Sequence, residues 1–306
     1  MTAKKDAAVI FTDGYVKSKD WVIIVSELAS LADEDVELTR IFTFKAGVWR
    51  HFDFDGWSIR SICGISKPDA RTYYLAKDGR IKVKTLDGWA EEAIADAGNG
   101  EGKYGYVNRI REIGGHLFVC GVAGQVYLRE RSGWVHFDEG ILANKTLAIA
   151  NTFYGIAGNS RQDMYLVGRR GLVCHYGGKS WQPEYLPTSE TLRGVCCVSP
   201  DEVYICGRNG SFFKGRKSNW INYSIPKADR HFWSVEVFRE KIYVAASDGL
   251  YVFDEDKVKP LETGLKPVPD GNRLHANEGV LWSFGVEHLC SFDGKKWTYV
   301  KHPDNE

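Results

Sequence analysis

Arginines and large aromatic side chains recur at two kinds of position in this chain, and both could bind acidic groups. Where a loop leads into a strand-like apolar run, the chain places Arg60, Arg109, Tyr154, Arg193, Trp233 and Arg273. In tight turns it places Arg169, Arg170 and Arg208. A guanidinium group pairs with a carboxylate through two parallel hydrogen bonds, and aromatic side chains anchor interfaces. We expect these residues to line one mouth that recognises an acidic or carboxylate-bearing protein. The alternative is that the arginines are solvated or paired with nearby acids.

No sequence pattern supplies a catalytic or metal site. The glycine-rich stretch from Gly98 to Tyr104 contains Lys103 but lacks the Ser or Thr, and the strand-to-helix context, of a phosphate-binding loop. The histidines are scattered singly, and the cysteines lack paired ligand spacing. Two carboxylates can converge in space without a sequence signature, so glycosidase chemistry stays an alternative. We predict a protein that is not an enzyme and has no catalytic residue, no metal and no cofactor.

The elements that must position these residues repeat about every forty residues. Six strand-like segments carry an aromatic residue, at positions 73, 118, 165, 204, 243 and 282. Tryptophans follow four of these aromatics by sixteen residues (73 to 89, for example) and one by fifteen, at positions 89, 134, 181, 220 and 297. The repeat around Tyr243 has Val258 there instead, and Trp49 marks one more unit at the front. The chain therefore contains seven units.

Each unit contains four short strand patterns separated by turn residues. The clearest unit runs through 192–198, 202–207, 211–215 and 220–224. Four antiparallel strands repeated radially form a β-propeller, which protects its sheet edges. We predict an all-β, seven-bladed propeller with four-stranded antiparallel blades and one domain over 1–306. A β-sandwich would not explain the repeat. Residues 7–12 form either the inner strand of the first blade or a closing strand of the last.

Two repeats share a family signature, an acidic residue and Tyr followed by Gly-Arg-x-Gly and a Trp. They span Asp163 to Trp181 and Glu202 to Trp220. The pattern resembles the photosystem II assembly-factor-like and BNR/Asp-box propellers, also described as sialidase-like or YVTN-like. The resemblance covers roughly Ser58 to Val300 and implies the fold, which hosts many functions. The sialidases open with Arg-Ile-Pro, whereas Arg109-Ile110-Arg111 lacks the proline. The assembly-factor-like group implies binding without catalysis, but its members are exported.

Composition narrows the classes of partner and compartment. Forty basic and forty acidic residues cancel, which argues against a general affinity for nucleic acid. No signal-peptide or membrane-spanning run is present, so we expect a cytoplasmic protein that binds no membrane. Seven cysteines, mostly inside apolar strand patterns, predict reduced and buried thiols.

Three long connections are expected to lie on the same face as the arginines, where binding usually occurs in rigid scaffolds: 26–37, 91–106 and 138–153. The first is acidic and could form a short helix, and the second is rich in Ala and Gly. The leading hypothesis is a protein-binding propeller, specifically an intracellular antidote of the immunity type that blocks a toxin. The alternatives are a sialidase-like carbohydrate enzyme or lectin, and a scaffold or assembly chaperone.

Overall fold

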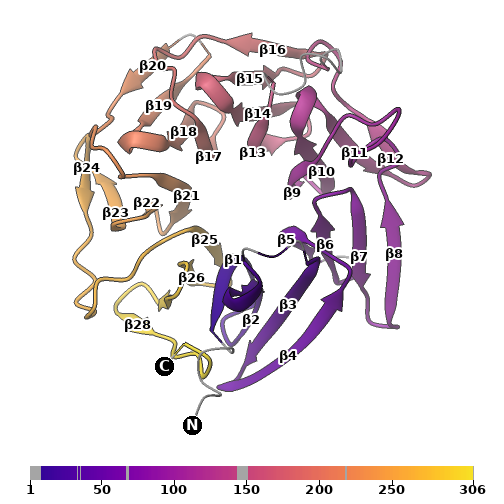
Figure 1. Ribbon diagram of the computed structural model, residues 1–306. Helices are drawn as coiled ribbons and strands as arrows, with labels where there is room; N and C mark the ends of the chain where they lie inside the picture. Colours follow the sequence, from indigo (N-terminus) through magenta and orange to yellow (C-terminus); the bar gives the residue numbers. More distant parts are fainter. Residues whose placement is uncertain are drawn as a thin grey trace. The chain divides into compact units, whose positions relative to one another are not determined.

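Seven four-stranded antiparallel sheets make up the described part of the chain. The computed structural model describes residues 8–32, 34, 36–66, 69–142, 151–217 and 219–305. Within every sheet the strands pair in chain order, so each sheet is a simple meander (Figure 1). The chain is a seven-bladed β-propeller, as its repeats predict. It divides into two compact units, a first unit of Met1–Ile59 with Asp229–Glu306 and a second unit of Arg60–Ala228.

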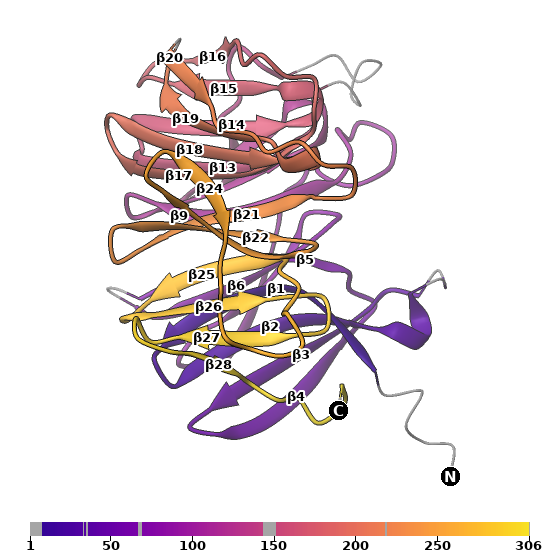
Figure 2. The same cartoon turned by 90° about the vertical axis from the view of Figure 1, so that its left-hand side faces the viewer.

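The first unit holds three blades. The strands of its N-terminal blade are β1 (Val9–Ser18), β2 (Trp21–Leu28), β3 (Leu38–Lys45) and β4 (Val48–Asp55). Those of the next are β21 (Phe232–Phe238), β22 (Lys241–Ala246), β23 (Gly249–Asp254) and β24 (Lys257–Pro260). Those of the last, side by side in Figure 2, are β25 (Arg273–Asn277), β26 (Val280–Phe284), β27 (Leu289–Phe292) and β28 (Trp297–Tyr299). The inner strand β25 lies between β1 and β21.

The N-terminal strand belongs to the first blade. β1 pairs with β2, and the last sheet consists of β25–β28 alone. The first of the two alternatives for this segment is therefore confirmed, apart from Ala7, which lies outside the described residues. The chain ends are still joined, because the Asn305 side chain bonds the backbone N–H and C=O of Val9 at 3.0 Å each.

The second unit holds four blades. The first two consist of β5 (Ile59–Ile65), β6 (Arg71–Ala76), β7 (Arg80–Lys84), β8 (Trp89–Ala93), β9 (Val107–Ile113), β10 (His116–Gly121), β11 (Val126–Glu130) and β12 (Gly133–His136). The next two consist of β13 (Phe153–Ser160), β14 (Asp163–Gly168), β15 (Val173–Tyr176), β16 (Trp181–Glu184), β17 (Leu192–Ser199), β18 (Glu202–Gly207), β19 (Phe212–Arg216) and β20 (Asn219–Asn222).

The repeated tryptophans occupy equivalent positions, as predicted. Each lies in the outer strand opposite the third strand, in the pairs Phe44–Trp49, Lys84–Trp89, Arg129–Trp134, Tyr176–Trp181, Gly215–Trp220 and Phe292–Trp297. Val258 holds this position opposite Phe253 in the blade without a tryptophan. The Trp181 indole N–H donates to the Phe137 C=O of the preceding blade at 2.7 Å. The indoles of Trp134 and Trp220 likewise donate to glutamates of the preceding blade, at 3.0 Å each. The tryptophans thus join neighbouring blades.

Glycine is required in one of the turns between second and third strands. Three of these turns form 3-10 helices in the second unit, namely η2 (Val122–Gly124), η4 (Arg169–Gly171) and η5 (Arg208–Gly210). Gly171 has φ +71°, and a Cβ there would lie 2.0 Å from the Thr188 carbonyl oxygen. Only a residue without a side chain fits this turn.

The long connections contain more structure than their composition predicts. The acidic one includes a single 3-10 turn, η1 (Ala29–Leu31), and no longer helix among its described residues. In the second, Ile94 and Ala97 are buried and Gly98 pairs with Gly105. Buried apolar side chains hold it in place despite its glycines. Residues 143–150 of the third lie outside the described part.

The cysteines are free thiols, and six of the seven are buried, which confirms the prediction of reduced, buried cysteines. In the described ranges, no helix is long and apolar enough to cross a membrane.

Candidate functional site

A β-bulge recurs near the start of the inner strands. In five of the sheets whose register the structure describes, the pairing skips one residue near the start of the inner strand. The skipped residues are Thr12, Asn108, Tyr154, Arg193 and Trp233. The residue before each bulge is apolar and buried, for example Phe153 and Leu192. A bulge redirects the side chain that it carries and is common beside functional sites. Three of the nine residues predicted to bind a partner, Tyr154, Arg193 and Trp233, occupy this position.

Arg109 lies one residue beyond the bulge of its blade. It pairs with Cys120 and is only 4% exposed. Asn108 occupies the bulge instead, and its side-chain amide donates to the Phe153 C=O at 2.8 Å. The sequence prediction missed Asn108, although the buried apolar residue before it is a signal that all five bulges share. Arg109 therefore offers little surface to a partner.

Tyr154, Arg193 and Arg208 gather in the second unit. The Arg193 guanidinium stacks over the Tyr154 ring, 4.0 Å from its centroid. Burial lowers the pKa of Arg193, and the positive charge of Arg208 acts in the same direction. Arg193 nevertheless remains cationic, since the pKa of an arginine is very high. The lowered pKa means that a positive charge is held where it is poorly solvated. An incoming carboxylate would offset the free-energy cost of this lost solvation.

Turn geometry holds the other arginines of the second unit. Arg208 begins η5, is exposed, and donates its backbone N–H to the Thr191 C=O at 2.9 Å. The Asn209 side chain donates to the Glu190 carboxylate at 2.9 Å, and the backbone C=O of Glu190 accepts the backbone N–H of Gly171. Glu190 therefore links η4 and η5. The second unit contains three more of the predicted arginines. Arg60 and Arg170 are exposed, and Arg169 is half-buried.

Trp233 and Arg273 meet in the first unit. The Arg273 guanidinium donates to the Trp233 C=O at 3.0 Å. The His231 ring lies edge-on to Trp233, with centroids 5.5 Å apart. Both Trp233 and Arg273 are half-buried, so each keeps part of its surface for a partner.

Acid–base clusters also occur, but their members pair with one another. Asp163 accepts bonds from His175 at 2.8 Å and from Arg216 at 2.9 Å. Burial raises the pKa of nearby Glu184, which accepts the Trp220 indole N–H. The Arg216–Asp163 and Trp220–Glu184 bonds join strands of adjacent blades, whereas the His175–Asp163 bond lies within one blade. Within the described ranges, no group of His, Cys, Asp or Glu could hold a metal ion.

Comparisons with known proteins give information on the function and the fold of the whole chain. No family model matches the chain. The chain is 26% identical to the curated immune protein Tsi7 of Pseudomonas aeruginosa over 303 residues, which cover 97% of this chain and 99% of that protein. This full-length similarity supports an immunity, or antidote, function.

Solved structures agree on the fold. The WD40 propeller domain of Doa1 has a TM-score of 0.66 at 10% identity and covers 100% of this chain and 99% of its own. YCF48 bound to the D1 peptide has a TM-score of 0.67 at 12% identity and covers 96% of this chain and 93% of its own. At these identities the similarity shows the fold alone. The chain is thus a seven-bladed propeller, and its sequence is similar over nearly its whole length to that of an immune protein.

Proposed function

We propose that this chain is an antidote of the immunity type that binds and blocks a toxin protein. The observation that carries the proposal is the similarity to Tsi7, which extends over nearly the whole of both chains. YCF48, a propeller of the same fold, is known with a peptide bound, which supports the use of this scaffold for binding protein. The function is binding without catalysis, in the cytoplasm, by one domain. The repeats belong, in this proposal, to the BNR/Asp-box superfamily.

The partner should present acidic or carboxylate-bearing groups. Burial, and to a smaller extent the positive charge of Arg208, lower the pKa of Arg193, while Tyr154 supplies an aromatic face. Such a group gains from a carboxylate that neutralises it and from contact with the ring. In the first unit, Trp233 and Arg273 offer the same combination. We propose that both groups contact the toxin, together with Arg60, Arg169 and Arg170.

A growth assay tests the function. The reading frame next to this chain's own in the native host is expressed alone and together with this chain. The proposal predicts that the neighbour alone arrests growth, that co-expression restores growth, and that the two proteins purify as a complex. A harmless neighbour, or a toxic one that neither binds this chain nor is neutralised by it, would contradict the proposal.

A further inference from the structure

A short segment joins the first and last blades of the first unit. Residues 301–305, here called the strap, follow β28 and Val300. The Asn305 side chain bonds the backbone of Val9 in the first blade, and it also donates to the Glu287 C=O in the last blade at 3.3 Å. The strap therefore holds both blades at once.

One buried side chain anchors the strap. His302 is 3% exposed, whereas the other four residues of the strap are half-buried or exposed. Its imidazole lies among the rings of Phe42, Trp49 and Phe11, with centroid distances of 4.2, 4.5 and 5.3 Å. The Trp49 indole N–H also donates to the Lys301 C=O at 3.1 Å. Three aromatic residues of the first blade thus form a cage around the imidazole.

The hydrogen bonds of the imidazole require its neutral form. The backbone N–H of Asp304 donates to the His302 Nδ1 at 3.2 Å, so the single ring proton of the neutral imidazole is on Nε2. Nε2 is buried and has no hydrogen-bond partner among the described residues. A second proton would have to bind at Nδ1, where it would break the bond from Asp304. It would also place a positive charge inside the cage, where aromatic rings replace water.

The surrounding charges oppose one another. Burial is the largest influence on His302 and lowers its pKa. The charge of His51 on β4 acts in the same direction, whereas Asp304 on the strap acts to raise the pKa. Asp304 also interacts with the charge of Arg40 on β3, which donates two hydrogen bonds to Asp53 on β4 at 2.8 and 2.9 Å. The carboxylate nearest to a protonated His302 is therefore shared with an arginine.

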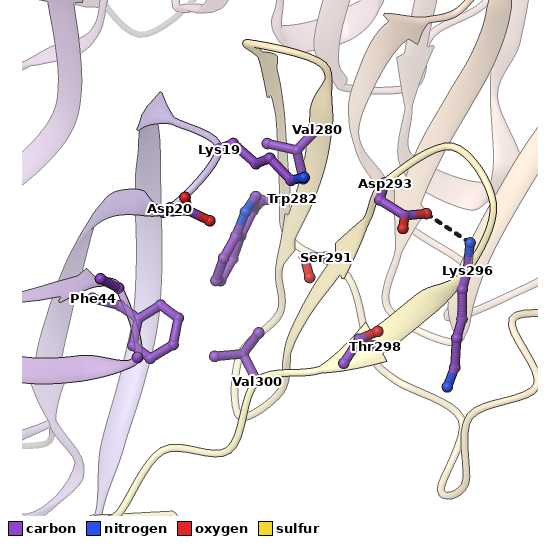
Figure 3. A pocket seen from close by; sticks show the side chains of 12 residues that line it. Lys19, Asp20, Phe44, Val280, Trp282, Ser291, Asp293, Lys296, Thr298 and Val300 are labelled. Atoms are coloured by element: carbon purple, nitrogen blue, oxygen red, sulfur yellow. Dashed lines mark hydrogen bonds between the residues drawn. The ribbon is translucent and has the colours of Figure 1, made fainter.

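The two blades are incompletely packed beside the strap. Val300, directly before the strap, lines a pocket of about 320 Å³ together with Phe44 of β3 and Trp282 of β26 (Figure 3). The Phe44 and Trp282 ring centroids are 6.1 Å apart. A region with fewer buried contacts opens at a lower free energy than a filled core. The pocket thus leaves the strap a larger share in holding these blades together.

We infer that the strap is an acid-released clasp between the first and last blades of the first unit. At neutral pH the uncharged His302 occupies its cage and Asn305 reaches Val9. Protonation of His302 removes this anchor, and the strap then leaves both blades. The imidazole of a released strap has a pKa of about 6.5, so release begins as the pH falls below this value and is complete below the lower pKa of the docked imidazole. The inference does not depend on the identity of the toxin.

Amide hydrogen exchange tests the inference on the intact protein. The Val9 N–H is bonded to the strap, whereas the Phe11 N–H of the same strand is bonded to the Val286 C=O at 2.9 Å. The ratio of their exchange rates cancels the pH dependence of the exchange chemistry. We expect the Val9 rate to rise relative to the Phe11 rate by up to ~tenfold for each pH unit below 6.5, until the docked imidazole is protonated. A ratio that stays constant across this range would overturn the inference.

A substitution in the cage identifies the group responsible. His302→Phe keeps an aromatic ring but cannot bind a proton, so the ratio of the Val9 and Phe11 rates should no longer change with pH. His116→Phe is the matched control, because His116 is a half-buried histidine of the second unit, and it should keep the parental pH dependence. A parental pH dependence in His302→Phe would show that another group releases the strap, and the inference would be wrong.

Two neighbouring charges provide a test that leaves His302 unaltered. Asp304→Asn removes a charge that raises the pKa of His302, so release should move to lower pH. His51→Gln removes a charge that lowers this pKa, so release should move to higher pH. Shifts that are absent or in the same direction would contradict the inference, even if the strap of His302→Phe fails to dock. A measured pKa above 6.5 for His302 would show that cation–π attraction to the cage outweighs burial, and would also overturn it.

Discussion

The tryptophan near the start of six of the outer strands allows one substitution to be compared in two settings. Trp181 is 1% exposed, and its indole N–H donates across the blades to the Phe137 C=O at 2.7 Å. Trp89 holds the equivalent position and is 47% exposed. Trp181→Phe and Trp89→Phe remove the same atoms, so a difference in stability reports the environment alone.

The expected cost is large only at Trp181. Losing the N–H leaves the partly buried Phe137 carbonyl without this donor, at about 1–2 kcal/mol. Shrinking the indole to a phenyl ring leaves a small void, and the lost burial and the void together cost about 1–2 kcal/mol more. Trp181→Phe should therefore destabilise the fold by about 3 kcal/mol. Trp89→Phe should cost less than about 1 kcal/mol, because much of the ring is already in water.

Urea denaturation of both variants and the parent, followed by far-UV circular dichroism, measures the difference. The midpoint should fall clearly for Trp181→Phe and hardly at all for Trp89→Phe. Similar midpoints for the two variants would refute the conclusion that the tryptophans stabilise the propeller by joining blades.

Three further outcomes follow from the structure. Burial acts to lower the pKa of His136, but bonds to Asp138 and Asp96 more than offset this effect, and the pKa is raised. Protonated His136 therefore stabilises the fold; the stabilisation is complete below pH 6.5 and is lost as the pH rises through the folded-state pKa. Burial lowers the pKa of His302, so the fold loses stability at this residue as the pH falls below 6.5. An NMR titration should therefore find a pKa above 6.5 for His136 and below 6.5 for His302. Burial raises the pKa of four cysteines to about 12, so a thiol reagent should react slowly with the native protein. After denaturation the same reagent should react readily with all seven cysteines. Gly171→Ala should lower the thermal midpoint, because a Cβ would collide with the Thr188 carbonyl oxygen at φ +71°; an unchanged midpoint would show that the turn can relax.

Local signals made most of the fold predictable. The second strand of the clearest unit, expected at 202–207, is β18 (Glu202–Gly207), because aromatic and β-branched residues between turn formers specify short strands directly. The spacing of Trp89, Trp134, Trp181 and Trp220 predicts one structural position, and they share it. These features depend on residues close together in the chain.

The candidate site was less predictable, because it depends on register and on distant segments. A bulge moves the ladder by one residue, and the residue types alone did not reveal that Asn108 rather than Arg109 occupies it. The stacking of Arg193 on Tyr154 joins separate blades. A pocket of the first unit is lined by Phe44 and Val300, which are far apart in the sequence, so no single segment contains a signal for it.

The affinity of this chain for its toxin tests the central claim most directly. Arg208 is exposed at the cluster with Arg193, and Arg131 is an exposed arginine of the same unit outside the proposed site. Removing a charge pair from a binding interface costs about 2–5 kcal/mol, so Arg208→Glu should weaken binding by at least ~30-fold. Arg131→Glu should change the affinity by less than ~threefold, and added salt should weaken binding of the parent. Isothermal titration calorimetry that finds parental affinity for Arg208→Glu, in a folded variant, would contradict recognition through this arginine cluster.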